Sequence, residues 1–113
     1  MPTVVHLTAG PPPGNATHTY TNPGPRTQQV VFAHASARLF SLALSPPVLQ
    51  VLHTPNGGVE VEVDMVTLWG PHSWWGLTGQ PLCPDLKPGD TLKLFLFSAA
   101  AAVDIRYDLK DVT

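Results

Sequence analysis

Charge is scarce in this chain of 113 residues: charged side chains make up 12% of it, and the formal net charge is −2. Nucleic-acid-binding domains need clustered Lys and Arg side chains, whereas the six basic residues here are scattered. We therefore expect no nucleic-acid partner. The charge is also uneven, because only Arg26 and Arg38 precede Val59 and all eight carboxylates follow it. The almost uncharged first half favours burial against another protein; the alternative is a surface kept soluble by hydroxyls and backbone.

Cysteine pairs, signal sequences and long hydrophobic runs are also lacking. The single Cys83 excludes an internal disulfide framework, and we expect it to pack between its proline neighbours as a small hydrophobe. The first residues show no basic segment followed by an apolar one, so we expect no signal peptide. No run reaches the roughly 18 apolar residues that a membrane-spanning helix needs, so we expect no membrane partner.

Alternation is what the sequence does have, most clearly in Thr91–Lys110, where two runs with a period of two flank four alanines. The first run alternates three leucines with a second set: Thr91, Lys93, Phe95 and Phe97. The second run alternates an apolar set with a charged set: Val103, Ile105, Tyr107 and Leu109 against Asp104, Arg106, Asp108 and Lys110. This period predicts two half-buried strands, the second with a charge-paired face toward water.

Gln28–Leu44 favours two strands, Val30–His34 and Arg38–Leu44, joined at residues 35–37. A helix that begins after Thr27 is the alternative, but it would have no clean polar face.

The clearest turn is Asn56-Gly57, which predicts a two-residue hairpin loop between Val48–His53 and Val59–Trp69. The second of these strands begins with strict alternation of apolar residues and carboxylates: Val59, Val61, Val63 and Met65 against Glu60, Glu62 and Asp64. After Met65 the pattern slips, which indicates a bulge or a segment buried on both sides.

The fold class predicted from these patterns is all-β: a single antiparallel β-sandwich or jelly-roll-like domain over residues 28–113. Residues 1–27 are rich in proline and glycine and poor in large apolar side chains, so they cannot form a core alone. We expect them to be an extended N-terminal arm that reaches a neighbouring subunit, or an edge segment of the same domain.

No pattern in the sequence points to catalysis, a cofactor or a metal. The chain has neither a nucleophile-elbow motif nor a glycine-rich phosphate loop, and its five histidines show no metal-ligand spacing. The carboxylates Glu60, Glu62 and Asp64 share one face of one strand, which fits a solvated edge better than a calcium site. We therefore expect a non-enzymatic protein without cofactor or metal.

Aromatic residues supply the candidate binding site: Trp69, His72, Trp74, Trp75 and Tyr107. Exposed tryptophans on a β-sandwich can stack on sugar rings or anchor a protein interface. The other interpretation is that residues 70–90 fold back and their tryptophans close the end of the sandwich.

In architecture, the chain resembles the small β-sandwich proteins that decorate or cement phage capsids. The resemblance rests on the leading TAGPPPGNATHTYTNPGP and on the closing LKPGDTLKLFLF and VDIRYDLKDV, without a diagnostic motif. It implies a structural and assembly protein that self-associates, often as a trimer, and binds neighbouring subunits of a capsid shell. The location would then be the virion, or else the cytoplasm. The alternative function is a carbohydrate- or ligand-binding module that uses Trp69, Trp74 and Trp75.

Overall fold

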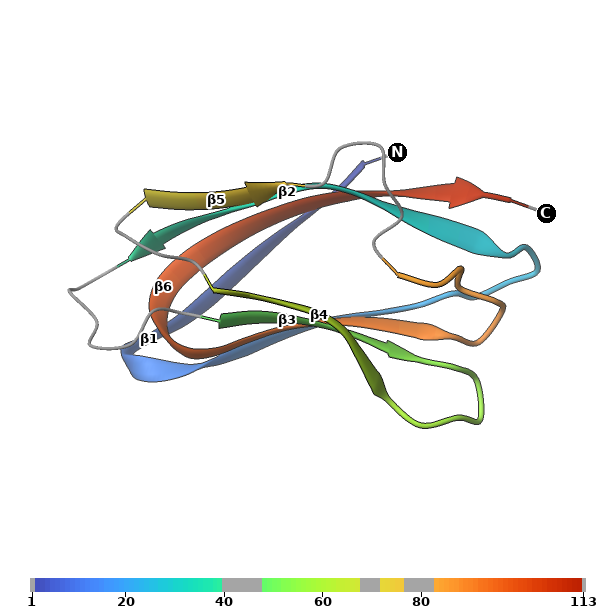
Figure 1. Ribbon diagram of the computed structural model, residues 1–113, viewed down its shortest axis with the longest axis horizontal. Helices are drawn as coiled ribbons and strands as arrows, with labels where there is room; N and C mark the ends of the chain where they lie inside the picture. The colour runs from blue at the N-terminus through green and yellow to red at the C-terminus, as the bar shows by residue number, and fades with distance from the viewer. Residues whose placement is uncertain (1, 40–47, 68–71, 77–82, 113) are drawn as a thin grey trace.

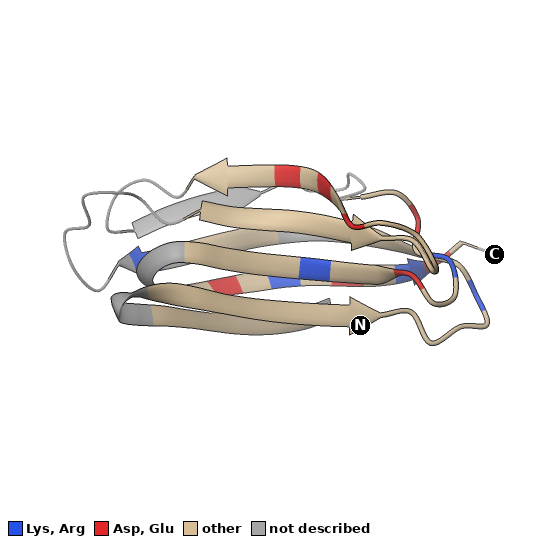
Figure 2. Cartoon of the chain, turned by 90° about the horizontal axis from the view of Figure 1, so that it is seen from below, with Lys and Arg blue, Asp and Glu red and all other residues tan. Residues whose placement is uncertain are grey.

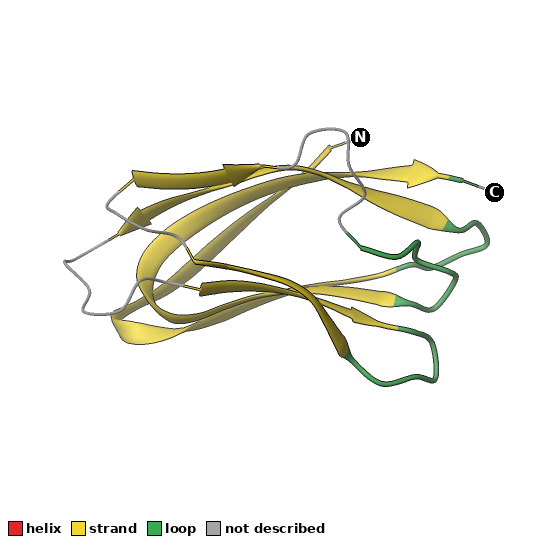
Figure 3. Ribbon diagram, in the orientation of Figure 1, coloured by secondary structure: helices red, strands yellow, loops and turns green. Residues whose placement is uncertain are grey.

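The computed structural model of the chain describes residues 2–39, 48–67, 72–76 and 83–112 (Figure 1). All regular structure in these ranges is β-strand (Figure 3), which confirms the all-β class. The strands are β1 (Pro2–Thr21), β2 (Gln28–Leu39), β3 (Val48–Thr54), β4 (Val61–Thr67), β5 (His72–Gly76) and β6 (Thr91–Asp111). Within the described ranges, no helix is long and apolar enough to cross a membrane.

β6 is the strand on which both layers of the fold are built. Its first half pairs with β3 and with the end of β1, and its second half pairs with β2 and with the start of β1. β4 extends the first group beside β3, and β5 extends the second beside β2. We call these the β3 layer (β4-β3-β6-β1) and the β2 layer (β5-β2-β6-β1). Figure 1 shows the layers stacked, with β6 curving from one to the other, so the predicted antiparallel sandwich is confirmed.

The bend between the layers changes which side chains of β6 point inward. The buried positions are even-numbered over Leu92–Leu96 and odd-numbered over Val103–Tyr107. Because successive side chains leave opposite faces of a strand, such a change requires an irregularity between the two runs. At the same level the pairing of β1 with β6 shifts register on both sides of Gly14. Strands that pass from one sheet to the other at a corner do so through such bends.

The core lies between the two layers and uses the inward sets that alternation predicts for β6. The fully buried side chains include three leucines of its first half and three residues of its second half: Leu92, Leu94, Leu96, Val103, Ile105 and Tyr107. β1, β2 and β3 contribute Val5, Leu7, Ala9, Val30, Ala35, Leu49 and Val51, and the segment before β6 adds Cys83 and Leu86. Burial of these apolar side chains is the main favourable contribution to folding.

β2 differs from its prediction, and β1 takes up one of the two alternatives predicted for residues 1–27. β2 is one strand from Gln28 to Leu39, so the predicted break at residues 35–37 and the alternative helix are both wrong there. Ala35 is fully buried and pairs with Ile105 of β6, so the ladder continues through the predicted break. Residues 40–44 of the predicted second strand lie outside the described residues. Of residues 1–27, β1 pairs with β6 from Pro2 to Thr21, so in this chain it forms an edge strand of both layers.

The β3–β4 hairpin is present, but its loop and its bulge differ from the predictions. The β3–β4 pairing ends at His53 opposite Val61, so the loop is longer than two residues. Gly57 has φ +76°, and the Gly58 N–H donates to the Pro55 carbonyl at 2.8 Å. The register shifts opposite Val51 and Leu52, earlier than the predicted slip after Met65.

The shift changes the inward face of β4. Val63 and Val66 pack against the core, whereas Val61 and Met65 are 55% and 56% exposed. Val59, ahead of the strand, is 81% exposed. Of the four apolar residues in this alternation, only Val63 therefore packs against the core. Met65 faces outward because the bulge reverses the alternation before it, whereas Val61 lies at the start of the strand and Val59 ahead of it.

Candidate functional site

The outward face of the β3 layer includes large apolar side chains. Phe95 and Phe97 alternate with the buried leucines of β6 and so point away from the core; their rings stack with centroids 5.4 Å apart. The register places Met65 and Gln50 in one row with Phe95, and Val48 in one row with Phe97. We call these five residues the outer face. Large apolar groups on the solvent side of a sandwich mark a surface suited to covering by another molecule.

Charged groups lie at one side of this outer face. The Lys93 ammonium lies 3.6 Å from a Glu60 carboxylate oxygen and 5.4 Å from the centre of the Phe95 ring. The Gln50 amide donates to the Glu62 carboxylate at 3.0 Å, which places Glu62 on the same side of the layer. Figure 2 views the molecule from below; in this layer the acidic residues lie on and just before β4, and β3 and β1 carry no Lys, Arg, Asp or Glu. The outer face is thus an apolar patch with a charged rim, which is the usual anatomy of a protein interface.

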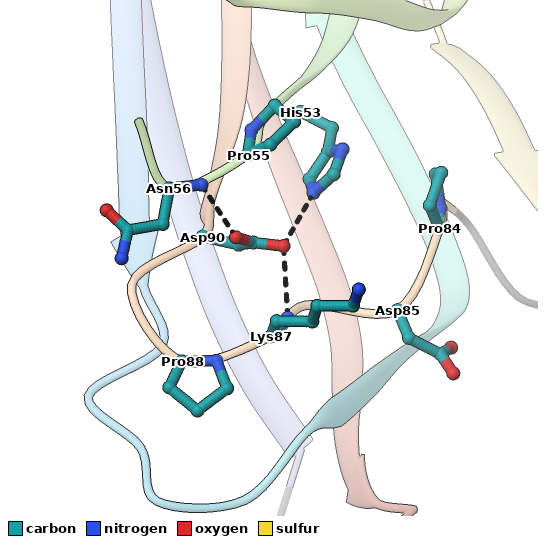
Figure 4. A pocket seen from close by; sticks show the side chains of 8 residues that line it. All are labelled: His53, Pro55, Asn56, Pro84, Asp85, Lys87, Pro88 and Asp90. Carbon is teal, nitrogen blue, oxygen red and sulfur yellow. Dashed lines mark hydrogen bonds and ion pairs between the residues drawn. The ribbon is translucent and has the colours of Figure 1, made fainter. Parts of the chain in front are cut away.

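The loop end of the sandwich holds a polar cluster around Asp90 (Figure 4). One carboxylate oxygen accepts the Asn56 N–H at 2.8 Å, and the other accepts the Lys87 N–H at 3.0 Å and lies 3.3 Å from His53 Nε2. Burial alone would raise the pKa of Asp90, but the two backbone donors and His53 together hold it below the ordinary value. The cluster lines an open hollow of about 460 Å³, and its carboxylate is fully occupied in joining the β3–β4 loop to the turn before β6.

Asn22 holds the neighbouring loop in the same way. Its backbone N–H donates to the Asp90 carbonyl at 2.9 Å, and its side-chain amide donates to the carbonyls of Arg26 and Leu86 at 2.8 Å. Gly89, with φ +90°, fits between these loops because a Cβ there would lie 2.4 Å from the Asn56 amide nitrogen. The polar groups at this end therefore lock loops together.

The outward face of the β2 layer differs in character. Asp104, Arg106, Asp108 and Lys110 are all exposed, which confirms the charged solvent face predicted for this half of β6. His6 Nδ1 lies 2.5 Å from an Asp104 oxygen, with both side chains exposed. A shallow hollow of about 220 Å³ beside this pair includes His34 and Arg106. This face is charged and open to solvent.

The predicted aromatic site is brought together only in part. Trp69 lies outside the described residues. His72, Trp74 and Trp75 are in β5, opposite Arg38, Ser36 and Ala35 in the ladder with β2, and their side chains are outside the description. Binding of sugar or protein by these residues stays a prediction.

Tyr107 lies in the core, where it is fully buried. Its hydroxyl lies 3.1 Å from His18 Nε2, and burial raises the pKa of Tyr107 to about 12. Burial also lowers the pKa of His18. His18 comes from the β3 layer and Tyr107 from the β2 layer, so this contact joins the two layers. Among the described residues, Tyr107 is therefore a core residue that packs between the layers.

Cys83 packs as a buried hydrophobe, as its sequence context predicts. Burial, with a contribution from Asp85, raises the pKa of Cys83 to about 12, so the thiol is a poor nucleophile at neutral pH. Among the described residues, no three His, Cys, Asp or Glu side chains converge on a point where a metal ion would fit.

Comparisons with known proteins extend only to the fold. No family model matches the chain. No curated protein sequence matches it either. The NLP core of Drosophila, a structure that bears on pentamer formation and histone binding by that protein, is similar over 98% of this chain and 99% of its own, with a TM-score of 0.59 and 14% identity. Capsid chains of infectious bursal disease virus are much less similar: the Gt strain gives a TM-score of 0.33 at 13% identity over 93% of this chain and 32% of its own.

Sequence reasoning missed the outer face, although the signal is present. The run Leu94-Phe95-Leu96-Phe97 is apolar on both faces of its strand, unlike the second half of β6. Strands that are apolar on both faces are typical of sheets covered on both sides. The exposure of Met65 had no such signal, because it depends on the bulge in β4.

Proposed function

We propose that this protein is a non-enzymatic structural and assembly protein that self-associates and binds other protein subunits. The observation that carries the proposal is the outer face, where the exposed Met65 and the half-buried Phe95, Phe97 and Val48 form an apolar patch on the outward side of the sandwich. Patches of this kind, bordered by polar and charged groups, are typical of protein–protein interfaces.

The polar clusters support a non-enzymatic role. The Asp90 carboxylate accepts three hydrogen bonds from its own chain, and the Cys83 thiol is buried with a raised pKa. A general base needs a free acceptor beside a substrate pocket, and a nucleophile needs an activating base.

The setting of the function follows from resemblance. The sequence architecture resembles capsid decoration proteins, which favours a virion shell as the partner and self-association into a homo-oligomer. The NLP core of Drosophila, which shares the fold, is a pentamer and binds histones. We propose the virion shell as the setting. Histones are strongly basic, so a test with a basic partner distinguishes a capsid setting from a histone-binding one.

Light scattering coupled to size exclusion tests the proposal over a range of loading concentrations. We expect a mass above the 12.1 kDa of one chain, rising with concentration to a plateau. A mass of one chain at every concentration would contradict self-association. Titration with purified core histones at physiological salt serves as the partner test: saturable, stoichiometric binding would move the setting from a capsid shell to basic proteins.

A further inference from the structure

The outward residues of β4 and β6 lie in shared rows on either side of β3. In one row across the layer, Leu52 of β3 lies between Glu62 of β4 and Lys93 of β6. In the next row, Gln50 lies between Met65 of β4 and Phe95 of β6. In these two rows the strands beside β3 present complementary groups: carboxylate against ammonium, and thioether against aromatic ring. The next row sets Thr67 against Phe97 across Val48.

We propose that the outer face packs on the outer face of a second copy of this chain, about a two-fold axis that runs along β3. The inference rests on the proposed self-association and names its surface. Such an axis lays β6 of each copy over β4 of the other. Lys93 of each copy then faces Glu62 of the other, and Phe95 of each copy faces Met65 of the other. A two-fold interface brings each of these contacts twice.

Charge selects this axis over the other strands of the layer. An axis along β6 would bring the two copies of Lys93 together, and an axis along β4 would bring the two copies of Glu62 together. Like charges that face each other across an interface are unfavourable, whereas the axis along β3 pairs opposite charges. The sulfur–aromatic contacts of Met65 and Phe95 add to the match.

The size of the face indicates a reversible dimer. With the axis along β3, the strands that overlap are β4, β3 and β6. Three strands about 4.8 Å apart and seven residues long at about 3.3 Å per residue give a face of roughly 14 by 23 Å. This face is at or below the small end of specific interfaces, which bury about 800 Å² per partner. We therefore expect a weak dimer, with a dissociation constant no tighter than micromolar.

A charge-swap series tests the axis, with sedimentation equilibrium of the full chain as the measurement. Lys93→Glu alone places carboxylates against carboxylates, and Glu62→Lys alone places ammonium groups against ammonium groups. We expect each single variant to weaken dimerisation by about tenfold and the double variant to restore it to within about threefold of the parent. Lys110→Glu, on the exposed face of the β2 layer, is the matched control and should leave the dimer unchanged.

Because Lys93 also pairs with Glu60 in its own chain, a second variant avoids that contact. Met65→Ser removes a side chain that is 56% exposed, so the fold should tolerate it, and we expect at least a tenfold weaker dimer. Val4→Ser, at a 49% exposed apolar residue of the β2 layer, is its control.

The outcomes separate this inference from the proposed function. Self-association that is unchanged in the Met65 and charge-reversed variants would overturn the β3 axis and leave the assembly function standing. Weakened single variants with no recovery in the double variant would also overturn the axis. A parent protein that stays monomeric would overturn both.

Discussion

The two halves of β6 are built alike on the inside and differently on the outside. Toward the core, each half presents three fully buried apolar or aromatic side chains. Toward solvent, Thr91–Phe97 shows Lys93 and two stacked phenylalanines, whereas the second half shows Asp104, Arg106, Asp108 and Lys110, all exposed. The outward surface of the second half is therefore charged and exposed to water, whereas that of the first half is partly apolar. The difference teaches that the inner pattern specifies the fold and that the outer pattern carries the information about partners.

The largest expected effect is on the free energy of unfolding and comes from the core that both halves of β6 share. Leu94→Ala and Ile105→Ala each remove a fully buried side chain from the same core, one from each layer. We expect each to lower the free energy of unfolding by about 2–5 kcal/mol, because a cavity remains in a closely packed interior. Urea unfolding of both variants measures this. A cost below about 1 kcal/mol in either would show that its layer is not part of one common core.

The next effect concerns the lock that holds the loop end of the sandwich. Asp90→Ala leaves two backbone N–H groups and His53 without their acceptor. We expect a loss of about 1–3 kcal/mol in the free energy of unfolding. Asp85→Ala, at an exposed carboxylate of the same turn, is the control and should cost less than about 0.5 kcal/mol. Equal effects of the two substitutions would refute a structural role for the Asp90 cluster.

The Asp90 cluster also gives a pH dependence. Its folded pKa is lowered from 3.8, so its contribution to stability is complete above pH 3.8 and is lost as the pH falls through the lower folded value. Thermal melts of the parent should therefore fall more steeply below this pH than those of Asp90→Ala. Parallel curves for the two proteins would contradict this.

The smallest effect lies where the layers meet through His18 and Tyr107. The folded pKa of His18 is lowered from 6.5, so the stability it contributes is present above pH 6.5 and is lost as the pH falls toward the folded value. His18→Gln should flatten the melting temperature between pH 6.5 and the onset of the Asp90 effect. A parent protein whose melting temperature is already flat in this interval would show that protonation of His18 does not strain the contact between the layers.

The fold was predictable where periodicity is undisturbed. The alternation of leucines before the alanines and of Val103, Ile105 and Tyr107 after them gives both inner faces of β6, and Asn56-Gly57 gives the β3–β4 hairpin. The phase of β4 was not predictable, because a single bulge opposite Val51 and Leu52 reverses which residues face the core. The sequence predicted a break in β2 at residues 35–37, where the side chains are small. The strand continues there, and Ala35 is fully buried opposite Ile105.

The candidate surface was less accessible to sequence than the fold. Tyr107 looked like part of an aromatic cluster, but its place in the inward set puts it in the core. The outer face joins residues from β3, β4 and β6 that are far apart in sequence, and only the strand register brings Met65 into one row with Phe95. Register is a long-range property that no local pattern contains.

A matched pair of double variants tests the contrast between the two outer surfaces most directly. Phe95→Ser with Phe97→Ser removes the stacked rings of the β3 layer, and Arg106→Ser with Asp108→Ser removes charge from the same strand in the β2 layer. Sedimentation velocity over a concentration series, with circular dichroism to confirm folding, is the measurement. The account predicts that the first pair yields monomers while the second associates like the parent. Association that survives the first pair and is lost in the second would contradict it.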